Sequence, residues 1–242
     1  MADPADPAPA AEMLPPPGSR PAAQALFGDR LPLAQRYAQL LVTVGAERGL
    51  IGPRERDRVW DRHVLNSAVL AELLDHGESV ADVGSGAGLP GIPLSLARPD
   101  LRLILVEPMQ RRCVFLREVV AELELEARVS VVRGRAPECA REIFSIDCVT
   151  ARAVAPLDRL VSWTMPLCRP GGRLLALRGR TAEHEVAQAE GEISQAGGEA
   201  PRVRVLGSEL LAEPVTVVEV RCSATRKSRR GGARNAEGHK RT

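Results

Sequence analysis

Residues 79–96 carry the pattern with the most specific chemistry in this chain. The apolar run 80–83 predicts a short buried strand, and the acid Asp82 lies within it. Three glycines then follow at alternate positions: Gly84, Gly86 and Gly88. Glycine tolerates a positive φ and has no Cβ, so such a turn can bring backbone N–H groups against a ligand. We therefore expect a strand, a nucleotide-type loop and a helix that begins near residues 89–91, where prolines are accepted.

Two cofactor classes fit this loop. Gly86, Gly88 and Gly91 match the dinucleotide fingerprint G-x-G-x-x-G, which would make the chain an NAD-type dehydrogenase. Asp82, two residues before the first glycine, and the proline-rich helix start favour another interpretation. They resemble the first motif of class I S-adenosylmethionine-dependent methyltransferases. Glycine N–H groups and a helix N-terminus favour a carboxylate, and S-adenosylmethionine carries one. We therefore expect S-adenosylmethionine as the cofactor.

Two further segments could hold the rest of a nucleoside. The apolar run 101–106 predicts a second strand. It ends in Glu107, about twenty residues beyond the glycines, where an acid can accept hydrogen bonds from ribose hydroxyls. Residues 129–132 predict a third strand. Backbone groups of Ala136 and Pro137, in the loop after it, could contact the adenine, although an ordinary connector fits these positions equally well.

The segment after the predicted fourth strand, 146–149, bears on the methyl acceptor. Methylases of adenine or cytosine amino groups carry an Asn/Asp-Pro-Pro-Tyr/Phe signature there, whereas this chain has Arg152 between alanines. Carbon-5 methylases of cytosine need an activated cysteine, and neither Cys148 nor Cys168 has the Pro-Cys setting or a nearby base. A ring nitrogen with a free lone pair needs neither the amino-methylase signature nor an activated cysteine. Guanine N7 fits, and Arg152 at the mouth of the sheet could recognise its acceptors.

The elements that must position these residues alternate between strand and helix. Such alternation is typical of an α/β fold in which helices cover both faces of a parallel sheet. Further helices are expected over 109–125, 157–167 and 181–195, and further strands over 173–177, 203–206 and 215–220. The last two strands are predicted to form a closing hairpin.

The two ends of the chain differ in composition from the middle. Residues 1–25 are mostly Ala and Pro, cannot bury a core and are predicted to be a disordered leader. Residues 26–75 predict an N-terminal helical cap, in which His63 is interpreted as a surface or capping residue. Residues 76–222 are the predicted methyltransferase domain. Residues 223–242 carry seven Arg or Lys against one acid, which predicts a disordered basic tail that attracts RNA.

Composition argues against several function classes. The five cysteines are odd in number and form no C-x-x-C pair, so we expect neither a disulfide framework nor a metal site. No apolar run reaches membrane-spanning length, and the N-terminus lacks the layout of a signal peptide. We therefore expect a cytoplasmic protein without membrane contact. A non-enzymatic RNA chaperone that uses the basic tail stays an alternative to an enzyme.

Four segments together carry a more specific pattern. They are HVLNS at 63–67, DVGSGAGLPGIP at 82–93, RRCVFL at 111–116 and RAVA at 152–155. This set resembles the glucose-inhibited division protein B family, bacterial methyltransferases of guanine N7 in small-subunit ribosomal RNA. The resemblance implies a class I, Rossmann-like, mostly parallel seven-stranded sheet with an N-terminal helical cap. It also implies a monomer whose partner is small-subunit ribosomal RNA within the ribosomal subunit.

The resemblance also implies site residues. It places S-adenosylmethionine contacts at Gly84, Leu89, Ala136, Pro137 and Arg152, with Arg152 also catalytic and near the target base. With the residues argued from chemistry, the expected cofactor-binding set is Gly84, Gly86, Gly88, Leu89, Glu107, Ala136, Pro137 and Arg152. The chain departs from the family pattern at Gly49-Leu50-Ile51 (usually Asn-Leu-Thr), Asn66 (often Asp), Glu107 (usually Asp) and Arg178 (usually Lys).

Overall fold

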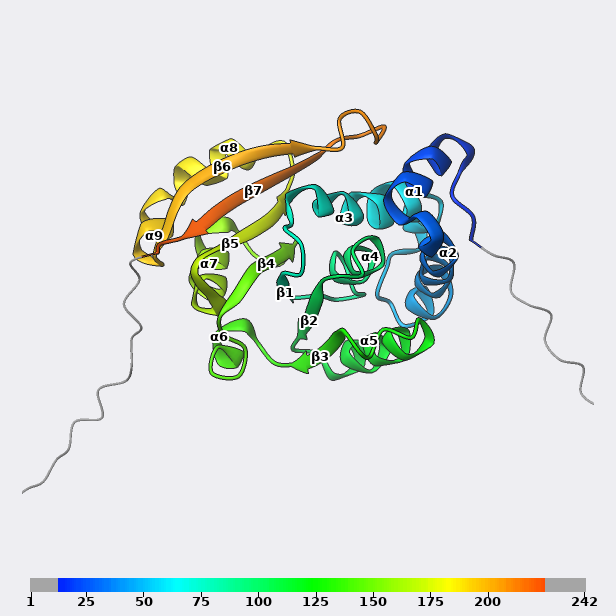
Figure 1. Ribbon diagram of the computed structural model, residues 1–242, viewed down its shortest axis with the longest axis horizontal. Coiled ribbons are helices and arrows are strands. Elements are labelled where there is room, and N and C mark those ends of the chain that lie inside the picture. Colours follow the sequence, from blue (N-terminus) through cyan, green and yellow to red (C-terminus); the bar gives the residue numbers. More distant parts are fainter. Residues whose placement is uncertain (1–12, 225–242) are drawn as a thin grey trace, which may run out of the picture.

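The computed structural model describes residues 13–224 and contains a seven-stranded sheet in the order β3-β2-β1-β4-β5-β7-β6 (Figure 1). The strands are β1 (Ser79–Val83), β2 (Arg102–Glu107), β3 (Val129–Arg133), β4 (Ile146–Arg152), β5 (Cys168–Arg178), β6 (Gly198–Leu206) and β7 (Val215–Cys222). Strands β1 to β5 run parallel, and β7 runs antiparallel to β5 and β6. The predicted fold class is confirmed. The strand order reverses at β1, and open α/β sheets bind ligands at such a point.

Helices cover both faces of the sheet, as the strand–helix alternation predicts. On one face α4 (Gly91–Ala97) and α5 (Gln110–Glu122) pack with the N-terminal helices. The other face carries α6 (Ala136–Cys139), α7 (Leu157–Thr164), α8 (Ala182–Gln188) and α9 (Glu190–Gln195). Side chains of β4 alternate between the two cores: Cys148 belongs to the first, and Val149 to the second. Arg152 therefore projects toward the face that the N-terminal helices cover.

The N-terminal cap begins earlier in the chain than predicted. A short 3-10 helix, Pro17–Ser19, leads into α1 (Arg20–Phe27). The ring of Phe27 meets the ring of Trp60 edge to face, with centroids 6.5 Å apart. The Trp60 indole N–H donates to the carbonyl of Met13 at 2.9 Å. The predicted leader is therefore wrong over residues 13–25, because alanines that look featureless in sequence allow α1 to pack closely. The prediction for residues 1–12 lies outside the described residues.

The cap is helical, but it is not built from regular α-helices. After α2 (Leu31–Leu40) the chain continues as a π-helix, Leu41–Gly45. The second half consists of a 3-10 helix (Pro53–Arg58), a π-helix (Val59–Leu65), α3 (Asn66–Ala68) and a 3-10 helix (Val69–Leu73). Wide helical turns are rare and occur frequently at functional sites. Val59 and His63, four residues apart, are both buried in this part of the cap.

Strands β4 and β5 are longer than predicted. β4 continues through Arg152, and β5 begins at Cys168. The early part of β5 contains Gly171, with a φ of 76°, and Gly172. A Cβ on Gly172 would lie 2.8 Å from the carbonyl oxygen of Asp147 on the neighbouring strand. These glycines therefore let the strand begin at Cys168 and continue past an irregular register.

The C-terminal part follows the prediction with one interruption. The helix expected over 181–195 is divided into α8 and α9 at Ala189. The expected closing hairpin is β6 and β7. Within residues 13–224 no helix is long and apolar enough to cross a membrane. The basic tail from residue 225 onward lies outside the part of the chain that the structure describes.

Candidate functional site

The turn between β1 and α4 has the conformation that its glycines predict. Gly84, Gly86 and Gly88 have φ values of 70°, 61° and 99°. A Cβ on Gly84 would lie 2.7 Å from a methyl group of Val154, and one on Gly88 would lie 2.6 Å from a side chain of α4. Ala153, just before Val154, itself has a positive φ of 53°. The turn therefore depends on glycine partly because the end of β4 packs directly against it.

Five N–H groups of this turn have acceptors inside the protein. The donors are Gly84, Ser85, Gly86, Gly88 and Leu89, and the acceptors are the carbonyls of Val106 and Ser85 and the carboxylate of Glu107, at 2.8–3.1 Å. The expectation that glycine N–H groups await a ligand carboxylate is therefore not met. A bound anion would need a donor other than these five N–H groups.

Asp82 is the buried centre of the turn. Its Oδ2 accepts from Ser85 Oγ at 2.6 Å and from the N–H of Gly91 at 3.0 Å, and its Oδ1 accepts from Thr150 Oγ1 at 3.3 Å. Burial raises the pKa of Asp82 from 3.8 to about 6, although these three donors and the charge of Arg152 act to lower it. Asp82 thus holds the start of α4 against β1 and β4, and its role is to shape the turn.

Glu107 ends β2 and is oriented from two sides. Its Oε2 accepts from the N–H of Gly86, and its Oε1 accepts from the N–H of Met109 at 2.9 Å. Arg112 Nη1 lies 3.7 Å from Oε2. The side chain is only 1% exposed, yet it lines a cavity. A carboxylate fixed in this way can accept hydrogen bonds from a diol, as predicted for the ribose.

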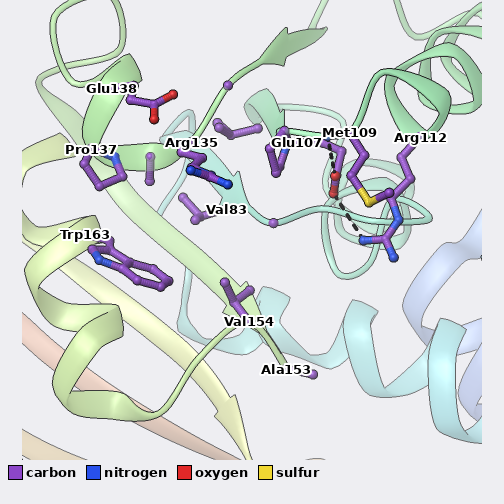
Figure 2. Close-up of a pocket in the computed structure, with 15 residues that line it drawn as sticks. Val83, Glu107, Met109, Arg112, Arg135, Pro137, Glu138, Ala153, Val154 and Trp163 are labelled. Carbon is purple, nitrogen blue, oxygen red and sulfur yellow. Dashed lines mark hydrogen bonds and ion pairs between the residues drawn. The ribbon is translucent and has the colours of Figure 1, made fainter.

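A cavity of about 600 Å³ opens beside the turn, at the carboxyl ends of β1, β2 and β3 (Figure 2). Its lining consists of Val83, Gly84, Val106, Glu107, Pro108, Met109, Arg112, Gly134, Arg135, Ala136, Pro137, Glu138, Ala153, Val154 and Trp163. In Figure 2, Glu107 and Arg112 lie on one side of it and Trp163 on the other. The mixture of apolar walls with a few oriented charges is typical of a nucleoside site.

The predicted site residues divide into two groups. Gly84, Glu107, Ala136 and Pro137 line the cavity and are brought together as predicted. Gly86, Gly88, Leu89 and Arg152 are not part of the lining. The first three belong to the glycine turn beside it, and Arg152 lies on the cap side. Contact of these four with a cofactor stays a prediction.

Arg152 is joined to the cap. Its Nη2 donates to the carbonyl of Arg62 at 3.0 Å and lies 2.9 Å from Nδ1 of His63. His63 Nε2 lies 2.7 Å from Glu55 Oε2. The interpretation of His63 as a surface or capping residue is therefore wrong, because it is 9% exposed and connects an acid to Arg152. Burial and the charge of Arg152 lower the pKa of His63, while Glu55 acts to raise it.

Sequence reasoning missed several residues of the cavity. Trp163, in α7, and Arg112, in α5, face it, although the sequence predicted only that both residues lie in helices. The signal for Arg112 was its place one turn into the helix that follows Glu107. Trp163 offered none, because it comes from a helix that returns to the site after a long separation in sequence.

Thiol and metal chemistry find no support in the described residues. The five cysteines all lie within the described residues, form no disulfide and are buried. Burial raises the pKa of Cys148, which works against a thiolate nucleophile. No group of three or more His, Cys, Asp or Glu within residues 13–224 could hold a metal ion.

Comparison with known proteins agrees with the cavity geometry in favouring a methyltransferase. Residues 30–212 match the family model described as "GidB: rRNA small subunit methyltransferase G". A protein named "Ribosomal RNA small subunit methyltransferase G" from Mycobacterium sp. (strain KMS) is 56% identical over 213 residues, which cover 87% of this chain and 93% of that protein. A protein of the same name from Mycolicibacterium smegmatis is 50% identical over 228 residues, covering 93% of this chain and 96% of that protein.

Solved structures agree on the fold. The apo form of the S-adenosylmethionine-dependent methyltransferase SibL aligns with a TM-score of 0.57 at 18% identity, covering 82% of this chain and 76% of that one. The [4+2]-cyclase SpnF aligns with a TM-score of 0.55 at 15% identity, covering 78% of this chain and 96% of that one. At such identities the likeness concerns the fold alone.

Proposed function

This chain belongs to the rRNA small subunit methyltransferase G family, and we propose that it methylates N7 of a guanine in small-subunit ribosomal RNA. S-adenosylmethionine is the cofactor, and when bound it supplies an activated methyl group on a sulfonium. The observation that carries the assignment is the cavity beside the glycine turn, where a buried carboxylate, Glu107, is oriented by two backbone N–H groups. An NAD-type dehydrogenase is no longer favoured, because the family is that of a methyltransferase.

The residues present fit the cofactor. Glu107 is the acceptor that we assign to the ribose hydroxyls. Ala136 and Pro137, across the cavity, are assigned to the adenine together with Trp163, whose flat ring suits it. Gly84 lines the same cavity at the end of β1. The nucleoside is thus held by β1, β2, β3 and α7, which meet at the carboxyl edge of the sheet.

The glycine turn needs a partner for the amino-acid end of the cofactor. The N–H groups of Gly86, Gly88 and Leu89 already donate within the protein, so these residues are assigned to shape and not to donation. Arg152 is the donor that we assign to the carboxylate. Its charge acts on Asp82 and on Tyr37, whose hydroxyl donates to the carbonyl of Ala87 in the turn at 2.9 Å. Arg152 also stands two residues before Val154, whose side chain packs against Gly84, so the end of β4 brings Arg152 next to the turn.

Methyl transfer to guanine N7 needs few catalytic groups from the protein. Guanine N7 keeps a free lone pair, so attack on the methyl group needs no general base, and the enzyme mainly holds the two groups in near-attack geometry. The product ring becomes positively charged, so a nearby cation cannot act by stabilising it. Arg152 is accordingly given a positioning role, through the cofactor or through guanine O6. We also infer a cytoplasmic monomer whose substrate is the RNA within a ribosomal subunit.

Transfer of a tritiated methyl group to ribosomal subunits and to naked ribosomal RNA tests this proposal. We expect label in the small-subunit RNA and, after mapping, on guanine N7. Arg152→Ala should lose about a hundredfold or more in rate, and Arg152→Lys should recover little because lysine lacks the planar fork. A label on a base carbon or an exocyclic amine would contradict the mechanism. Absence of transfer with intact RNA binding would favour the RNA chaperone instead.

A further inference from the structure

One edge of the Arg152 guanidinium is held by the cap. Nη2 contacts the carbonyl of Arg62 and Nδ1 of His63, and Nη1 lies 3.4 Å from Ser67 Oγ. Within residues 13–224 no acceptor contacts Nε. The anchored edge therefore leaves the Nε edge for a ligand, and the direction in which that edge points depends on the anchor.

The chemistry of arginine fixes the state of His63. A guanidinium only donates hydrogen bonds, so Nδ1 of His63 must accept from Arg152 and must carry no proton. The imidazole proton then belongs to Nε2, which donates to Glu55 Oε2 at 2.7 Å. Glu55 therefore selects the tautomer of His63 that can accept from Arg152.

We propose that Glu55 and His63 are positioning residues that fix the Arg152 guanidinium for the cofactor. Glu55, from the 3-10 helix Pro53–Arg58, sets the tautomer of His63, from the π-helix Val59–Leu65, and His63 in turn holds Arg152 at the end of β4. The inference rests on the proposed role of Arg152 and assigns the cap a direct part in cofactor binding. Without the contacts from Glu55 through His63, the Arg152 side chain would keep several rotamers. Fixing one of them when the cofactor binds would cost conformational entropy and weaken the affinity.

The arrangement has a property that mere packing lacks. Protonated His63 would carry a hydrogen on Nδ1, directed at a donor of Arg152, so the anchor exists only while His63 is neutral. The charged groups that act on His63 are Arg152, Glu55 and Arg62, while Tyr37 and Asp82 act on Arg152 from α2 and β1. Cofactor affinity should therefore fall as His63 takes up a proton.

Calorimetric titration of the full-length protein with S-adenosylmethionine tests the inference. His63→Asn keeps an acceptor close to the place of Nδ1 but cannot titrate, whereas His63→Phe keeps the ring and removes the acceptor. Loss of a hydrogen bond to a charged group corresponds to about tenfold or more in dissociation constant, which we expect for His63→Phe and not for His63→Asn. Glu55→Ala should weaken binding less, because part of the imidazole keeps the accepting tautomer.

The matched control is Glu118→Ala on α5, which breaks the surface ion pair between Glu118 and Arg48 and leaves Arg152 untouched. It should bind as the wild type does. As the pH falls below about 6.5, the wild-type dissociation constant should rise relative to that of His63→Asn, at a lower pH than an ordinary histidine would give, because burial and the charge of Arg152 lower the pKa of His63.

Each outcome separates the two proposals. No binding by the wild type would refute the cofactor assignment itself. Wild-type binding with equal affinities for wild type, His63→Phe and Glu55→Ala would refute the positioning role alone. If His63→Phe unfolds, the comparison of wild type with His63→Asn across pH decides, and a constant ratio would overturn the inference.

Discussion

The pKa of Asp82 makes a prediction about stability that can be given a magnitude. The carboxyl is fully buried, and its pKa rises from 3.8 to about 6 in the folded protein. The folded state therefore holds the proton more tightly than the unfolded chain does. The stabilisation that results is complete below pH 3.8 and is lost as the pH rises through 6. A shift of about two units corresponds to about 3 kcal/mol.

The assay is urea unfolding of wild type and Asp82→Asn at steps from about pH 4 to about pH 7.5. Asparagine cannot titrate, and other groups shared by both proteins cancel in the difference between their free energies of unfolding. Relative to Asp82→Asn, the wild type should lose about 3 kcal/mol across this range. Its free energy should change most between the unfolded and the folded pKa of Asp82.

Asp147 supplies a control of opposite sign. Burial acts to raise the pKa of Asp147, but hydrogen bonds from Ser79 and Arg169 outweigh it and lower the pKa to about 2. The stability that Asp147 contributes is therefore present above 3.8 and lost as the pH falls toward 2. Measured from about pH 2 to about pH 4, the free energy of unfolding of the wild type relative to Asp147→Asn should rise with pH, and above about pH 4 it should stay constant while that of Asp82 falls. A flat difference for Asp82→Asn, beside the expected slope for Asp147→Asn, would refute the reasoning about burial.

Three further predictions concern binding and catalysis. Gly86→Val should abolish S-adenosylmethionine binding in calorimetry, because a β-branched residue cannot hold a φ of 61°, and unchanged affinity would count against the turn. Cys148→Ala and Cys168→Ala should keep methyl transfer, since both thiols are buried, and a folded, cofactor-bound but inactive variant would reveal a covalent mechanism. Deleting residues 223–242 should flatten the salt dependence of RNA binding and leave cofactor affinity intact, whereas an unaltered slope would make the tail a solubilising appendage.

The parts of the site that sequence predicted are those whose signals are local. The glycine turn follows its strand directly, and Glu107 ends the next strand along the chain, so topology alone brings Gly84 and Glu107 to one edge of the sheet. Ala136 and Pro137 follow for the same reason, as residues after the third strand. What links these positions is strand order, and strand order in an α/β sheet follows from alternation of elements.

The parts that sequence did not predict depend on distant partners or irregular backbone. His63 and Arg152 are 89 residues apart, and no sequence pattern in either segment predicts their contact. His63 lies in the π-helix Val59–Leu65 and is 9% exposed, although the sequence favoured a surface or capping position for it. Trp163 reaches the cavity from α7 on the opposite face of the sheet from α5. Each of these residues is identified only when the packing of elements is known.

The departure from the family pattern at Gly49-Leu50-Ile51 can be judged from the same geometry. Gly49 has a φ of 66°, the N–H of Leu50 donates to the carbonyl of Gly45 at 2.8 Å, and Ile51 is buried in the core of the cap. The segment therefore closes the first half of the cap through a turn and an apolar anchor. The link from cap to chemistry runs instead through Glu55 and the π-helix that follows it. Loss of polar groups at 49–51 thus leaves the anchor of Arg152 intact, and any effect on activity should come through RNA binding and not through the cofactor.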